Sequence, residues 1–152
     1  MAQTFKSKGA IQKYLQKEIN AALKNEVANE IKAVKQDAIQ ENVYDVYTPS
    51  HYIRRGKSGG LLDKSNMKAE LLEDGVIVVK NETPPNPNYP HSDLSRPHIG
   101  WAVEQGRGYF FHNPGARPFI QPTVDELKQN KQHVNALMDG LKKMGFNVKR
   151  GG

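Results

Sequence analysis

The sequence predicts an α+β fold, in which a long N-terminal helix and a C-terminal helix pack on a small antiparallel β-sheet, with long mobile loops. Three local patterns predict it. A helical apolar stripe runs over residues 8–41, an Asp-Gly pair separates two strand-like segments, and a helix-start signal opens an amphipathic segment over residues 123–144. A length of 152 residues is typical of one ordinary domain. We therefore expect a single domain over residues 1–152.

The N-terminal helix is expected over residues 8–41 because apolar side chains recur there at intervals of three and four residues. At about 1.5 Å per residue such a helix is about 50 Å long, which exceeds what one small domain covers. We therefore expect part of the apolar stripe to face another subunit. The stripe consists of Ile11, Leu15, Ile19, Leu23, Val27, Ile31, Val34 and Ala38.

Residues 42–122 are expected to hold the sheet and the loops. A basic, glycine-rich stretch with little to bury predicts a mobile loop over 50–64. Asp74 and Gly75 lie between two segments of strand propensity, which predicts a β-hairpin. The proline-rich stretch over 82–98 cannot supply the hydrogen bonds of a β-ladder, so we interpret it as an extended excursion.

A proline-braced segment leads into the C-terminal helix. The prolines fix the backbone angle φ, which makes the segment a rigid strap, and the apolar ring of Phe119 is expected to enter the core. Arg117 is expected to tie the strap to a carboxylate or to a backbone carbonyl. Thr123 as N-cap and Glu126 three residues later form a capping box, which predicts a helix over 123–144.

Charge and composition limit the class of protein. The net charge is +6, from 22 Lys and Arg against 16 Asp and Glu, and the basic excess lies toward the two ends of the chain. A solvated helix face and a flexible basic tail over 145–152 explain this charge more simply than a dedicated nucleic-acid site. The chain has no cysteine, which excludes disulfides and thiolate metal sites. It has neither an apolar run of roughly 18 residues nor the apolar core of a signal peptide, so we expect no membrane contact and synthesis in a cytoplasm.

Several patterns suggest chemistry, but each has a plainer interpretation. The sequence GKS at 56–58 copies the end of a phosphate-binding P-loop, although His51 stands where that loop needs a glycine. The histidines lack the spacing of metal ligands, and no nucleophile, base or carboxylate pair has a supporting local motif. We therefore expect no enzyme activity, no catalytic residue, no metal site and no cofactor.

Three stretches occur in an order that one protein family shares. The first follows the long helix and contains TP at 48–49, YIRRG at 52–56 and GLL at 60–62. The second is WAVEQG at 101–106, and the third is ARPFIQP at 116–122. Together they resemble the small neck proteins of long-tailed bacteriophages, which are variously called head-tail joining, tail-completion or minor tail proteins.

This resemblance implies a virion structural protein that forms a ring of six copies at the head-proximal end of the tail. The ring would complete the tail and join it to the head connector, while genomic DNA passes through its bore with non-specific contact. The implied partners are further copies of the chain, the head connector or adaptor protein, and the tail tube and terminator proteins. The implied location is the neck of a virion that is assembled in the host cytoplasm.

The resemblance also points to two groups of residues. The expected partner or assembly loop consists of Arg54, Arg55, Gly56, Lys57, Gly60 and Leu61. The expected structural motif consists of Trp101, Glu104, Gly106, Arg117, Pro118, Phe119 and Pro122.

The alternative is a small basic nucleic-acid-binding protein that uses Arg54, Arg55 and Lys57 together with the tail at 149–152. The dependence of DNA binding on salt concentration distinguishes the two hypotheses. A ring component binds DNA weakly and loses it as salt rises, whereas a dedicated binder holds DNA at physiological salt.

Overall fold

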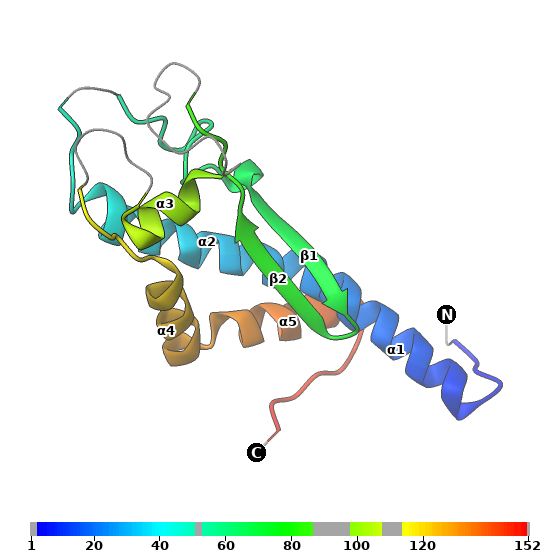
Figure 1. The fold of residues 1–152 in the computed structure, drawn as a ribbon. Helices are drawn as coiled ribbons and strands as arrows, with labels where there is room; N and C mark the ends of the chain where they lie inside the picture. Colours follow the sequence, from blue (N-terminus) through cyan, green and yellow to red (C-terminus); the bar gives the residue numbers. More distant parts are fainter. Residues whose placement is uncertain (1–2, 51–52, 87–97, 108–113, 152) are drawn as a thin grey trace. The chain divides into compact units, whose positions relative to one another are not determined.

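The computed structural model describes residues 3–50, 53–86, 98–107 and 114–151. Most of the excursion expected over 82–98 and Tyr52 of the first motif lie outside these described residues. The α+β fold predicted from the sequence is confirmed, since helices accompany a two-stranded antiparallel sheet (Figure 1).

The internal contacts of the chain divide it into two compact units. One small core cannot cover a helical segment of this length, and each unit buries a different stretch of it. Unit 1 comprises Met1–Glu30, Ala69–Val78 and Gln132–Gly152, and unit 2 comprises Ile31–Lys68 and Val79–Lys131.

The N-terminal helical segment runs from Lys8 to Tyr44, slightly beyond the end predicted at residue 41. Its first turn is capped by Ser7, whose Oγ accepts a hydrogen bond from the backbone N–H of Ala10 at 3.2 Å. Two π-helical turns, which hold more residues per turn than an α-helix, were not predicted. In order, the segment consists of α1 (Lys8–Ala22), the π-helical turn η1 (Leu23–Val27), α2 (Ala28–Ile39) and the π-helical turn η2 (Gln40–Tyr44).

In unit 1, the last helix, α5 (Gln132–Lys143), packs on α1 and η1, where Ala22 and Leu23 are buried. Gly140 permits the close approach, because a Cβ there would lie 3.2 Å from the Cβ of Ala22. The chain thus covers this part of the apolar stripe itself. Two side chains of the stripe, Ile11 and Leu15, remain exposed in unit 1, at 40% each. They are the stripe residues of this unit that are exposed enough for the subunit contact expected from the sequence.

The C-terminal helix predicted over 123–144 is two helices, α4 (Ile120–Asn130) and α5. Lys131 separates them with a left-handed φ of 52°, a conformation that the sequence does not signal because the residue is not glycine. The predicted capping box is also wrong. The hydroxyl of Thr123 donates to the carbonyl of Phe119 at 2.6 Å, one turn inside a helix that has already begun.

The C-terminal tail makes contacts within unit 1, so the expectation of a flexible tail does not hold for all of its described residues. The ring of Phe146 lies 6.0 Å from that of Tyr14, between centroids. The ring of Phe5, which precedes α1, lies 5.2 Å from the same Tyr14 ring, between centroids. Further along, the guanidinium of Arg150 donates to Oδ1 of Asn135 at 2.8 Å.

The predicted hairpin is confirmed, with β1 (Met67–Glu73) paired to β2 (Val76–Asn81) (Figure 1). Gly75 takes the positive φ of 81° that its turn requires. The side chain of Asn20 fixes this turn, because its Oδ1 accepts from the N–H of Gly75 at 2.9 Å and its Nδ2 donates to Asp74 at 2.8 Å. The stretch WAVEQG forms most of a short helix, α3 (Ile99–Gln105), which ends at Gly106 with a left-handed φ of 63°.

Candidate functional site

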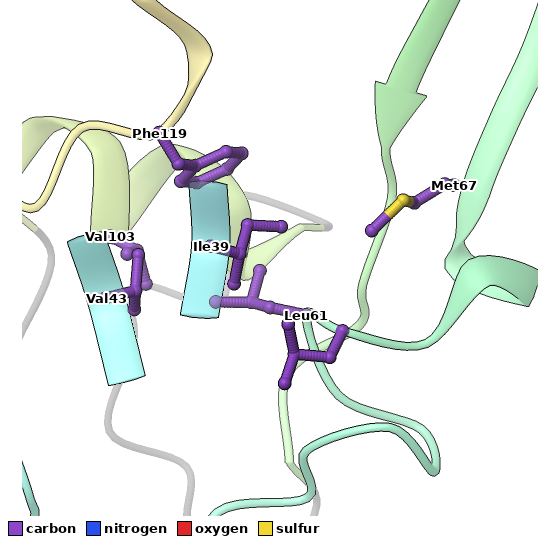
Figure 2. Close-up of a cluster of buried hydrophobic side chains, with 7 residues drawn as sticks. Ile39, Val43, Leu61, Met67, Val103 and Phe119 are labelled. Atoms are coloured by element: carbon purple, nitrogen blue, oxygen red, sulfur yellow. The ribbon is translucent and has the colours of Figure 1, made fainter. Parts of the chain in front are cut away.

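The three motif stretches meet in the core of unit 2. Phe119 is 2% exposed, which confirms the prediction that its ring packs in the core, and Val103 of the second motif lies in the same cluster. Leu61, which was expected in the assembly loop, is a core residue at 4% exposure (Figure 2). The cluster consists of Ile39, Val43, Leu61, Leu62, Met67, Val103 and Phe119.

The GLL stretch of the first motif is held by side chains that donate to its backbone. The carbonyl of Gly60 accepts hydrogen bonds from Asn66 Nδ2 at 3.1 Å and Thr83 Oγ1 at 3.2 Å. A Cβ on Gly60 would lie 2.5 Å from the carbonyl oxygen of Gly56, so the chain folds back on itself too tightly for a side chain. The expectation that residues 50–64 bury little is therefore wrong for Gly60, Leu61 and Leu62, which are all buried.

Two arginines and two tyrosines form a cluster at the start of this segment. The guanidinium carbon of Arg54 lies 4.7 Å from the centre of the Tyr44 ring and 5.4 Å from that of Tyr47. Arg117, from the third motif, lies 5.1 Å from the same Tyr47 ring. Tyr47 therefore contacts a guanidinium from each of two motifs, an arrangement in which cation–π attraction holds both. We call Tyr44, Tyr47, Arg54 and Arg117 the arginine–tyrosine cluster.

Both arginines of the first motif donate hydrogen bonds to backbone carbonyls. Arg54 donates through Nη1 to the carbonyl of Tyr44 at 3.1 Å, and Arg55 donates through Nη2 to the carbonyl of Pro84. Burial raises the pKa of the Tyr44 hydroxyl, while the nearby charge of Arg54 and the backbone N–H groups of Leu61 and Gly56 pull it down. The side chain of Tyr44 is therefore covered in part by the loop that contains Gly56 and Leu61. Of the expected assembly residues, Lys57 alone is fully exposed.

The second and third motifs bind each other through Glu104. Its Oε2 accepts from the N–H of Phe119 at 2.8 Å and from the N–H of Ile120 at 3.3 Å. These are donors at the start of α4, so a carboxylate from α3 supplies the cap that α4 lacks in its own sequence. Gly106 also contacts this strap, because a Cβ there would lie 2.2 Å from the backbone nitrogen of Ala116.

The remaining motif residues lie around this contact. Trp101 and Pro122 are half-buried and Pro118 is exposed, whereas the side chain of Arg117 is buried. The backbone N–H of Arg117 donates to the carbonyl of Val103 at 2.9 Å, which places the strap beside α3. Arg117 therefore holds the strap through its ring contact and its backbone.

Lys35 is a buried charge that sequence reasoning missed. Its Nζ donates to the carbonyl of Val79 at 2.6 Å, inside unit 2. Burial lowers the pKa of Lys35, and the attraction of the Glu104 carboxylate opposes that shift. No sequence pattern marked this lysine, but Tyr44 and Tyr47 carried a usable signal, since two aromatics three residues apart precede an arginine pair.

Exposed aliphatic side chains flank the arginine–tyrosine cluster. Ile53, next to Arg54, is 85% exposed, and Val46, next to Tyr47, is 66% exposed. Tyrosine and arginine are enriched at protein–protein interfaces, and these two aliphatic side chains add apolar surface beside them.

Unit 1 carries a separate open groove of about 880 Å³ along α1. Leu15, Ile19 and Leu71 supply its apolar lining, and lysines supply its charge. Within the described residues no group of three His, Asp or Glu side chains is arranged to hold a metal ion. None of the helices described here combines the length and the apolar composition needed to cross a membrane.

Comparison with known proteins identifies the family. The model of the YomN family matches residues 7–143. The chain therefore belongs to the YomN family, which is phage-derived. Neither a curated protein nor a solved structure matches the chain.

Proposed function

Because the chain belongs to a phage-derived family, we propose that it is a virion structural protein of the tail neck. In this role copies of the chain form a ring, a hexamer by analogy with the neck proteins, at the head-proximal end of the tail. The ring completes the tail and joins it to the head connector, and genomic DNA passes through its bore. Its neighbours are the connector or adaptor protein on one side and the tail tube and terminator proteins on the other.

The observation that carries this proposal is an exposed aliphatic pair beside the arginine–tyrosine cluster. Ile53 and Val46 are exposed, while their neighbours Arg54 and Tyr47 contact each other and Leu61 is buried. Tyrosine and arginine are enriched at protein–protein interfaces. This face of unit 2 therefore suits a protein partner.

The same geometry weakens the alternative of a dedicated nucleic-acid-binding protein. The guanidinium group of Arg54 lies on tyrosine rings and that of Arg55 donates to a backbone carbonyl, so both groups already make contacts within the protein. Arg150 of the tail likewise donates to Asn135. Lys57 remains exposed, which is consistent with weak, non-specific contact with DNA in the bore.

The proposal is tested by placing a charge on the exposed face. Ile53→Asp should leave the melting temperature near that of the wild type, because a side chain 85% exposed has little packing to lose. In a phage that lacks the native gene product, this variant should nevertheless fail to yield joined particles, because a buried carboxylate would have no partner at the contact. Electron micrographs of the lysate would show separate heads and tails.

Leu72→Asp is the matched control, since Leu72 is 59% exposed on β1 in unit 1. It should melt normally and restore joined particles. If Ile53→Asp also restores infectious particles, the face around Ile53 is not a joining surface. If purified protein and lysates show the chain in no virion at all, the proposed function fails as a whole.

A further inference from the structure

We propose that copies of the chain associate head to tail, with the groove on α1 of one copy receiving the acidic face of α2 and η2 of the next. The inference rests on the proposed function, because it names the two surfaces that would build the ring. It depends on the charge of two stretches of the helical segment, each described within its own unit.

The first surface is the groove in unit 1. Lys13, Lys17 and Lys24 line it and are all exposed, and they recur at intervals of four and seven residues, which places them on one side of the helix. Asp74 also lines the groove, so its lining holds three lysines against one carboxylate. Over residues 8–24 the chain carries four lysines and one glutamate. The groove is therefore basic and has an apolar lining.

The second surface lies in unit 2. Asp37 on α2 and Glu41 on η2 are four residues apart and both exposed, so their carboxylates form a short row on one side of the helical segment. Asp45, just beyond η2, is also exposed and accepts a hydrogen bond from Nε2 of Gln40 at 2.6 Å. No lysine or arginine occurs between residues 37 and 45.

The two rows match in spacing and are opposite in sign. Lys13 and Lys17 are separated by one helical turn, about 6 Å, as are Asp37 and Glu41. Pairing the groove with a second groove would bring lysine against lysine, and pairing the acidic row with itself would bring carboxylates together. Like charges placed opposite each other in an interface oppose association. Charge therefore disfavours both symmetric pairings and favours the pairing of two different surfaces.

A contact between two different surfaces leaves one of each unused at the ends of any chain of copies. Such an association closes into a ring when the rotation between neighbours permits it, and otherwise grows into a filament. This is the property that the proposed neck ring requires. The occupant of the groove is accordingly a second copy of the chain.

The test uses two charge-reversed variants of the full chain. The first carries Lys13→Glu with Lys17→Glu, and the second carries Asp37→Lys with Glu41→Lys. Sedimentation velocity at low salt, over a range of protein concentrations, measures self-association of each variant alone and of an equal mixture. Each variant alone should associate about 100-fold more weakly than the wild type, because both of its surfaces then carry the same sign.

The mixture gives the decisive result. The acidic groove of the first variant faces the basic row of the second, and the basic groove of the second faces the acidic row of the first. Association of the mixture should return to within about tenfold of the wild type, with the variants alternating. A control variant, Lys128→Glu with Lys149→Glu, makes the same change in net charge at two exposed positions elsewhere and should associate like the wild type.

Three results would overturn the inference: a wild type that stays monomeric at every concentration, variants that associate as strongly as the wild type, or a mixture that remains dissociated. If the lysines bound DNA instead of a second copy, the first variant would bind DNA more weakly than the wild type, and mixing the two variants would not restore self-association. The inference and the proposed function fail separately. Unchanged association with intact head joining refutes only the inference, whereas rescued association of a protein found in no virion refutes only the function.

Discussion

Replacing Glu104 by alanine tests the contact that joins the second and third motifs. The carboxylate accepts two hydrogen bonds at the start of α4, at 2.8 and 3.3 Å, and its charge attracts the buried Lys35. Loss of a helix cap costs about 0.5–2 kcal/mol, and a hydrogen bond to a charged group contributes about 1.5–3 kcal/mol. Because the second bond is long and the side chain is only half-buried, we expect Glu104→Ala to lower the free energy of unfolding by about 2–4 kcal/mol.

Urea unfolding followed by circular dichroism at neutral pH measures this difference. Glu104→Gln keeps an acceptor oxygen but loses the charge, so it should cost about half as much as Glu104→Ala. Gln105→Ala is the matched control, because Gln105 is the exposed neighbour on the same helix and should change the free energy of unfolding by less than about 0.5 kcal/mol. If Glu104→Ala unfolds at the same urea concentration as the control, the carboxylate does not hold the start of α4 and the reasoning is wrong.

Three further predictions concern stability. Gly60→Ala should cost about 2–4 kcal/mol in urea unfolding, because its Cβ would lie 2.5 Å from the Gly56 carbonyl oxygen, whereas Gly9→Ala in α1 should be neutral or stabilising. Lys131→Gly should raise the melting temperature, since it removes a left-handed residue that costs about 1 kcal/mol; a lower melting temperature would contradict this. Burial lowers the pKa of Lys35 in the folded state below its usual value of 10.5, so as the pH rises the folded state loses this proton before the unfolded state does. The free energy of unfolding of the wild type, relative to that of Lys35→Met, should therefore rise with pH up to about 10.5. A difference between the two proteins that does not change with pH would refute this prediction.

The parts of the fold that the sequence predicted depend on neighbours along the chain. The apolar stripe of the long helix and the Asp74–Gly75 turn are local signals, and both appear as expected. Phe119 was also predicted correctly as a core residue, because a large apolar ring between prolines has little other use.

The parts that sequence reasoning missed depend on contacts between distant residues. Thr123 satisfied the rule for a capping box, yet Glu104 caps the helix from another element, so α4 begins earlier. Gly60 and Leu61 lie in a polar, glycine-rich stretch, and their burial requires Asn66 and Thr83, which no local pattern connects to them. The arginine–tyrosine cluster joins two motifs far apart in sequence, so Arg54 and Arg117 were named without the Tyr47 ring that both of them contact.

The alternation of the two units along the chain sets the order in which a ribosome can deliver them. Unit 2 ends at Lys131, so all of it has been synthesised before α5 exists. Unit 1 starts before unit 2 in the sequence but is completed only by α5, so Leu23 on η1 lacks its cover until α5 has been translated. Apolar surface exposed in this way is where nascent chains aggregate or recruit chaperones. A message truncated before the codon for Gln132 would therefore produce every residue of unit 2 together with a helix that has no partner to cover it.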